Sequence, residues 1–71
     1  MSLEIFETNI KTQEEANYLL QLLQHSISDG LISFDLKDSN HILCIETNRE
    51  ISGVVLSVFR KQGFYCQKLK D

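Results

Sequence analysis

The stretch Thr12-Gln13-Glu14-Glu15 decides how this chain folds, because an apolar run gives way there to a helical pattern. Thr12 and Glu15 have the S/T-x-x-E spacing of a capping box. In that motif the hydroxyl accepts a hydrogen bond from the backbone N–H of the third helical residue, and the carboxylate accepts from the N–H of the capping residue. We therefore expect a helix to begin directly after Thr12.

The residues that follow have the periodicity of an amphipathic helix. Apolar side chains recur at spacings i, i+3, i+4 and i+7, at Ala16, Leu19, Leu20 and Leu23. Such a stripe packs against a core. The helix is expected to end near His25-Ser26, where the imidazole would favour the negative end of the helix dipole.

Four runs have the composition of β-strands, and their ranges are 2–10, 31–37, 41–46 and 64–69. In the second run Ile32, Phe34 and Leu36 alternate with polar residues, as a half-buried strand requires. Asp38-Ser39-Asn40 has the chemistry of a tight turn, which predicts a hairpin between the second and third runs.

A second helix is predicted after Thr47-Asn48-Arg49-Glu50, which repeats the S/T-x-x-E spacing. Its apolar stripe would consist of Ile51, Val54, Val55 and Val58, and Gly63 would end it. A shift of 35 residues superimposes this cap and stripe on the first cap and stripe.

Two β-α-β halves in series give the order βαββαβ. We expect an α+β, ferredoxin-like sandwich in which two helices cover one face of a four-stranded antiparallel sheet. The first and third strands would be central, and residues 1–71 would form one domain.

Composition excludes several classes of function. The net charge is −3 and the pI about 5.2, so the chain lacks the positive charge that nucleic-acid binding requires. No apolar run approaches the length of a membrane span and no signal peptide is recognisable, which favours a cytoplasmic protein with no membrane partner.

In length and element order the chain resembles the heavy-metal-associated domain of copper chaperones and metal-transport ATPases. The loop into the first helix, the hairpin at residues 35–40 and the closing Gly63-Phe64 carry the resemblance. That family holds a soft metal with M-x-C-x-x-C, whereas the equivalent positions here are Ile10, Thr12 and Glu15. The resemblance therefore implies the fold without the metal site, and Thr12 and Glu15 are interpreted as a helix cap.

Cys44 and Cys66 are the remaining candidates for a metal site, with His41 or His25 as an additional ligand. The predicted topology places the first strand between the two cysteines, at a separation of roughly 9–10 Å from strand spacing. That separation exceeds the reach of one zinc ion or a disulfide. Buried free thiols are the favoured interpretation, and no cofactor is expected.

The helix-free face of the sheet is the candidate interaction surface. Because side chains alternate along each strand, one set is expected to face the helices. That set is Leu3, Ile5, Ile32, Phe34, Leu36, Leu43, Ile45, Phe64 and Cys66. The residues expected on the uncovered face are Phe6, Ile42, Cys44, Tyr65 and Leu69. An apolar set on an uncovered face favours docking of a protein partner or a homodimer.

No glycine-rich phosphate loop, G-x-S-x-G motif or acid–base pair is present, so we do not expect an enzyme. The favoured function is that of a degenerate heavy-metal-associated-like domain acting through protein–protein contacts, in metal homeostasis. Two alternatives stay open: a metal carrier that uses Cys44 or Cys66 in a dimer, and a small-molecule sensor of the amino-acid-binding ACT type.

Overall fold

The computed structural model describes residues 2–35 and 41–69, which form six regular elements. Their bounds are β1 (Ser2–Thr8), α1 (Gln13–Ser26), β2 (Leu31–Asp35), β3 (Ile42–Thr47), α2 (Ser52–Gln62) and β4 (Cys66–Lys68). The element order is the one predicted. Leu36 and the predicted turn at Asp38-Ser39-Asn40 lie outside the described residues.

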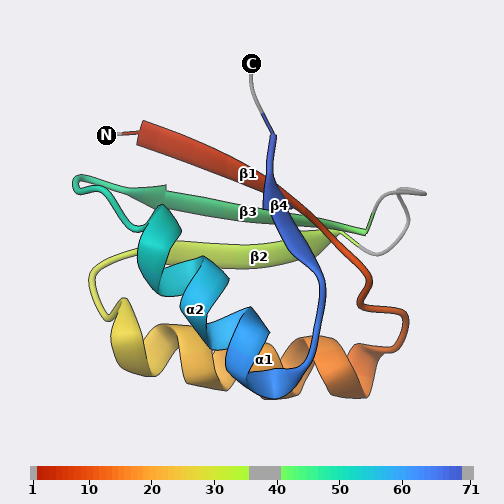
Figure 1. Ribbon diagram of the computed structural model, residues 1–71. Helices are drawn as coiled ribbons and strands as arrows, with labels where there is room; N and C mark the ends of the chain where they lie inside the picture. The colour runs from red at the N-terminus through yellow and green to blue at the C-terminus, as the bar shows by residue number, and fades with distance from the viewer. Residues whose placement is uncertain (1, 36–40, 70–71) are drawn as a thin grey trace.

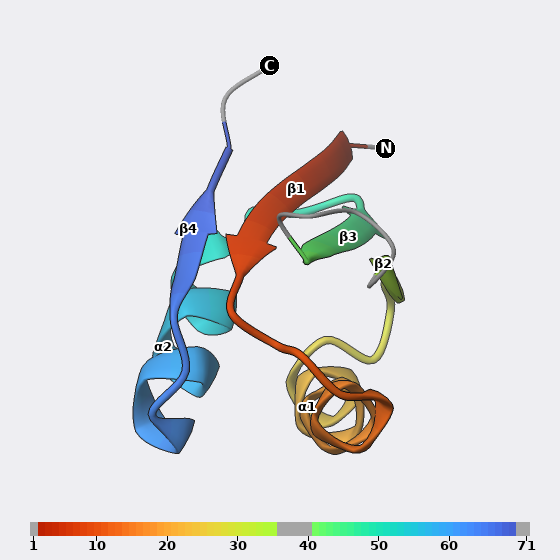
Figure 2. The same cartoon turned by 90° about the vertical axis from the view of Figure 1, so that its right-hand side faces the viewer.

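The strands form one antiparallel sheet with the order β2-β3-β1-β4. The predicted central position of the first and third strands is therefore confirmed. Both helices lie on the same side of this sheet (Figure 1), and the view at right angles shows the opposite side without a helix (Figure 2). Within the described part of the chain, neither helix is long and apolar enough to cross a membrane.

The predicted capping box at the beginning of α1 is confirmed. The Thr12 hydroxyl accepts from the Glu15 backbone N–H at 3.1 Å. In return, Glu15 Oε1 accepts from the backbone N–H groups of Thr12 at 3.4 Å and Lys11 at 3.0 Å. These bonds satisfy donors that the first helical turn cannot satisfy itself.

The second predicted capping box is wrong, and so is the 35-residue repeat at the helix starts. Thr47 is the last residue of β3, where it lies opposite Ser2 of β1. Because β3 continues to that point, residues 48–51 are needed to bring the chain from the sheet to the helix layer. The helix then begins at Ser52, whose backbone N–H donates to the Glu50 carboxylate at 2.9 Å.

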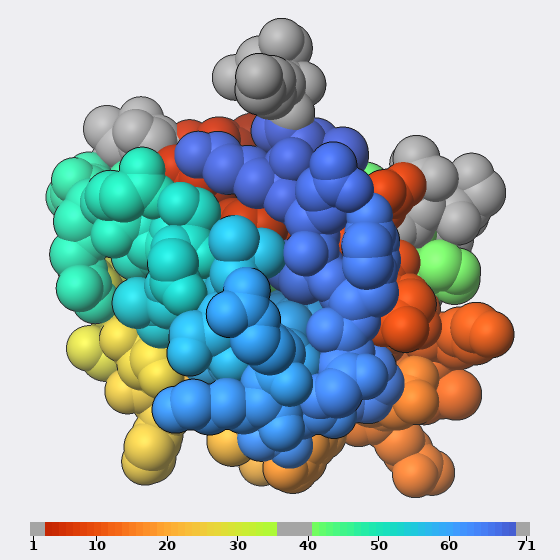
Figure 3. Space-filling view, in the orientation of Figure 1, coloured from red at the N-terminus to blue at the C-terminus, as the bar shows by residue number. Residues whose placement is uncertain are grey.

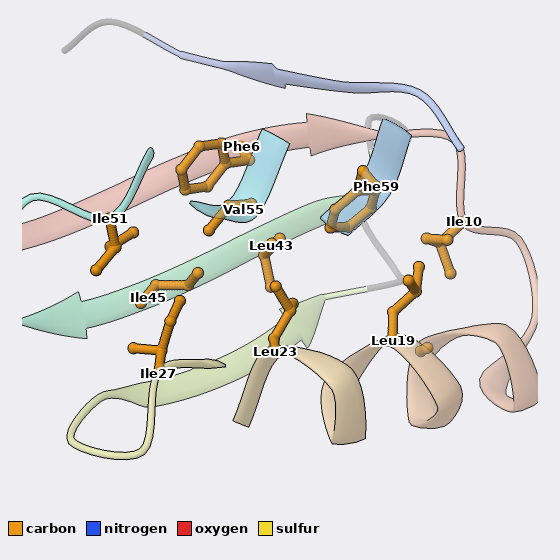
Figure 4. Close-up of a cluster of buried hydrophobic side chains, with 11 residues drawn as sticks. Phe6, Ile10, Leu19, Leu23, Ile27, Leu43, Ile45, Ile51, Val55 and Phe59 are labelled. Atoms are coloured by element: carbon orange, nitrogen blue, oxygen red, sulfur yellow. The ribbon is translucent and has the colours of Figure 1, made fainter. Parts of the chain in front are cut away.

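The core lies between the sheet and the two helices (Figure 4). α1 contributes three of its four predicted residues, Ala16, Leu19 and Leu23, whereas Leu20 is only half-buried and lies outside the core. The stripe of α2 differs from the prediction, because Phe59 is fully buried whereas Val54 is 38% exposed. The fully or almost fully buried apolar residues are Phe6, Ile10, Ala16, Leu19, Leu23, Ile27, Leu43, Ile45, Ile51, Val55 and Phe59.

Gly63 ends α2, as predicted. Its φ of 80° is left-handed, and its N–H donates to the Arg60 carbonyl at 3.1 Å. The next N–H, of Phe64, donates to the Phe59 carbonyl at 2.9 Å. Glycine enters this region without the steric cost of a Cβ, so the chain can reverse here toward β4.

Candidate docking face

The orientation of β1 is opposite to the prediction. Phe6 is fully buried and packs among the core side chains in Figure 4, whereas Leu3 is 58% exposed. Phe6 lies opposite Leu43, another core residue, and this register places both on the helix side. The prediction that Phe6 lies on the uncovered face, with Leu3 and Ile5 toward the helices, is therefore wrong.

Polar residues on the inward side of β1 explain the error. Glu4 and Thr8 alternate with Phe6 and therefore face the helix side. The Glu4 carboxylate forms an ion pair with Lys68 Nζ of β4 at 2.8 Å. The Thr8 hydroxyl donates to the His41 carbonyl at 2.7 Å. Because an ion pair compensates the Glu4 charge and a hydrogen bond engages the Thr8 hydroxyl, the inward side of β1 does not need to be uniformly apolar.

We call the helix-free side of the sheet the open face, and the pairing register defines its members. On the central strands, Leu3 lies opposite Glu46, Ile5 opposite Cys44, and Glu7 opposite Ile42. The complete set is Leu3, Ile5, Glu7, Leu31, Ser33, Asp35, Ile42, Cys44, Glu46, Tyr65, Gln67 and Leu69. Four of the five residues expected on this side, Ile42, Cys44, Tyr65 and Leu69, lie there.

These side chains form three rows that cross the strands. The first row contains Leu31, Glu46 and Leu3; the middle row contains Ser33, Cys44, Ile5 and Leu69; the third row contains Asp35, Ile42, Glu7 and Gln67. The middle row carries no charge. The carboxylates therefore lie in the rows on either side of an uncharged centre.

A hollow of about 370 Å³ opens beside the first row. Its walls include Leu3, Leu31 and Cys44, together with the carboxyl-bearing Glu46. The other lining residues are Gln24, Gly30, Ile32 and Ser33. The hollow thus combines apolar walls with one acidic group.

All charges on the described part of the open face are negative. They belong to Glu7, Asp35 and Glu46. Lys68 of β4 lies opposite the buried Phe6 and therefore on the helix side, where it forms the ion pair with Glu4. Tyr65 lies near Glu7, and its hydroxyl is within hydrogen-bonding reach of Glu7 Oε1, at 3.3 Å, and of the Gln67 side chain. Desolvation, followed by the nearby Glu7 charge, raises the pKa of Tyr65, so its phenol remains a neutral donor.

The two cysteines lie on opposite sides of the sheet. Cys44 belongs to the open face, whereas Cys66 lies opposite Thr8 and packs against the core. Cys66 also lines a second hollow, of about 290 Å³, between α2 and β4, which lie side by side in Figure 3. Burial raises the pKa of the Cys66 thiol to about 12. Both thiols are free, and their placement prevents them from binding one metal ion together.

The remaining candidate ligands do not gather elsewhere. Among residues 2–35 and 41–69, no group of three or more His, Cys, Asp or Glu side chains is arranged to hold a metal ion. Thr12 and Glu15 are engaged in the cap of α1. His25 is exposed in the last turn of α1, where a positive charge is favourable.

No protein-family model matches the chain, and the search of curated proteins finds no match. The open face is therefore the feature of the molecule that bears on function.

Proposed function

We propose that this protein is a non-enzymatic docking domain that binds another protein chain through the open face. One observation carries this proposal: the uncovered side of the sheet presents exposed Leu3 and Leu31 next to the half-buried Ile5, Ile42 and Cys44. Apolar side chains that are adjacent on a surface are typical of protein-binding sites.

We further propose that the domain is ferredoxin-like and related to the heavy-metal-associated domains, with a role in metal homeostasis. The βαββαβ order and the central position of β1 and β3 support this relationship. The capped beginning of α1 supports a function other than metal carriage by the monomer, because its hydroxyl and carboxylate already bind the backbone.

Photo-crosslinking tests docking through the open face. A photoreactive amino acid is placed at Leu3 or Leu31, and at Glu14 of α1 as the control, since all three positions are exposed. We expect Leu3 and Leu31 to give one discrete crosslinked species, a second copy or another protein, that excess unmodified protein suppresses. Equal crosslinking from Glu14, or no suppression by competitor, would contradict docking through this face.

Native mass spectrometry separates docking from metal carriage. Reduced protein is mixed with Cu(I) or Zn²⁺, and the proposal predicts no stoichiometric mass shift. A shift that disappears in Cys44→Ser or Cys66→Ser would instead support a metal carrier.

A further inference from the structure

We propose that the open face binds an amphipathic protein helix whose apolar stripe is flanked by lysine or arginine residues. One of these cationic side chains would enter the hollow beside the first row and pair with Glu46. This inference rests on the proposed function and names the chemistry of the partner.

The dimensions of the open face fit a helix that crosses the strands. Four strands spaced by about 4.8 Å give the middle row a length of roughly 14 Å, and the first and third rows are about 13 Å apart. A helix with its side chains is about 10–12 Å across. A helix along the uncharged middle row would thus contact Cys44, Ile5 and Leu69 with its apolar stripe.

The charges of the open face select a basic partner. A helix on the middle row would have Glu46 on one flank and Glu7 on the other. Within the described part of the chain, the Glu46 side chain has neither a hydrogen bond nor an ion pair, so an incoming cation would displace no existing partner. Complementary charge of this kind fixes both the partner and its orientation.

The hollow beside the first row can accommodate one cationic side chain of the partner helix. A lysine or arginine side chain has an aliphatic stem that packs on apolar surface and a charged head that seeks a carboxylate. Leu3 and Leu31 supply the apolar walls, and Glu46 supplies the carboxylate. Charge-assisted hydrogen bonds of this type are stronger than neutral ones.

The same charges disfavour other occupants. The carboxylates of the open face would repel the phosphates of nucleic acid and the headgroups of anionic lipid. Two copies of the chain, face to face, would place Glu7 and Glu46 of one copy in the same interface as those of the other. Like charges brought together in this way cost binding energy.

Titration of the 71-residue chain with synthetic helices tests the proposal. The probe is a fluorescent peptide of about 18 residues, roughly 27 Å long as a helix, with a leucine stripe flanked by lysines. Its counterpart has glutamate in place of each lysine. We expect the basic peptide to bind at least tenfold more tightly by fluorescence anisotropy, and its affinity to fall as salt is raised.

Matched variants locate the contact. Glu46→Gln removes the charge with little change in shape, and we expect it to weaken binding of the basic peptide by about fivefold to tenfold. Glu14→Gln, an exposed change on α1, is the control and should leave the affinity unchanged. Amide chemical shifts should change at Ile5, Cys44 and Glu46, and circular dichroism checks that each variant is folded.

Three results would overturn the inference: equal binding of the acidic peptide, no effect of Glu46→Gln, or shift changes confined to the helix side. If sedimentation shows a dimer and the crosslinks from Leu3 and Leu31 join its two copies, docking through this face stands but the basic partner does not. If neither peptide binds and open-face crosslinks are also absent, both proposals fail.

Discussion

At several points in this small domain, individual side chains form hydrogen bonds with backbone groups at the ends of helices and strands. Thr12 and Glu15 do so at the beginning of α1, and Glu50 does so at the beginning of α2. His41 has a left-handed φ of 51°, and its carbonyl accepts from both the backbone and the hydroxyl of Thr8. The first of these devices has a local sequence pattern, which is why it could be predicted.

Removal of the first cap should cost measurable stability. Thr12→Ala leaves the Glu15 N–H without its acceptor, and we expect a loss of about 1 kcal/mol. In a domain of this size that corresponds to a decrease in Tm of roughly 4–8 °C. Thr12→Ser keeps the hydroxyl and serves as the control in thermal denaturation followed by circular dichroism. An equal decrease in both variants would show that the hydroxyl does not act as a cap.

Cys66 should make the fold sensitive to alkaline pH. Its pKa is about 12 in the folded chain, against an ordinary value of 9.0. Above pH 9 the unfolded chain therefore loses this proton first, and the free energy of unfolding should fall progressively as pH rises from 9 toward 12. Below pH 9 the thiol is protonated in both states and has no such effect.

Urea titrations at several pH values measure this loss. Cys66→Ala should reduce the alkaline slope, although the raised pKa of Tyr65 leaves a slope of the same sign above pH 10. An unchanged slope in Cys66→Ala would show that the thiol is not the responsible group.

At the scale of elements, the two helices begin in different ways although their sequences suggest a repeat. The pattern at Thr47 resembles that at Thr12, but the pairing of Thr47 with Ser2 keeps it in β3. A local motif does not reveal how far a strand continues, because that is set by its neighbour in the sheet. The predicted stripe of α2 ends at Val58 and so omits Phe59, which lies four residues beyond Val55 and is fully buried.

Gly53 within α2 and Gly63 directly after it provide a matched pair of substitutions. Gly53 lies in the helix, and a Cβ there would meet no heavy atom within 4 Å. Gly53→Ala should therefore raise the free energy of unfolding by about 0.5–1 kcal/mol. Gly63→Ala also meets open space, but its φ of 80° is strained for alanine, so we expect a loss of about 1 kcal/mol. Chemical denaturation of both variants should give changes of opposite sign.

At the scale of the whole molecule, the sequence was sufficient for the element order, the antiparallel sheet and its central strands. It was not sufficient for the side of the sheet that β1 turns to the helices. Residues 3–10 carry apolar side chains in both alternating positions. Glu4 and Thr8 alternate with Phe6 on the inward side, where Lys68 and His41 bind them. Those partners are more than 30 residues away along the chain, so no local pattern indicates them.

Truncating one side chain on each side of β1 tests the orientation of this strand. Phe6→Ala empties a core position and should cost about 3–5 kcal/mol. A single core of this size supplies only about 3–5 kcal/mol in total, so the variant should be largely unfolded. Leu3→Ala, on the open face, should change the stability by less than about 1 kcal/mol. Comparable destabilisation of both variants by circular dichroism would contradict the orientation of β1.

β2 is an outer strand of the sheet, and its five residues, Leu31–Asp35, include neither proline nor lysine. Natural proteins commonly use such residues to keep outer strands from joining other molecules. Purified material held at millimolar concentration should therefore slowly form fibrillar assemblies that bind thioflavin T. Ser33→Lys, which adds a charge to this strand, should lengthen the lag before they form.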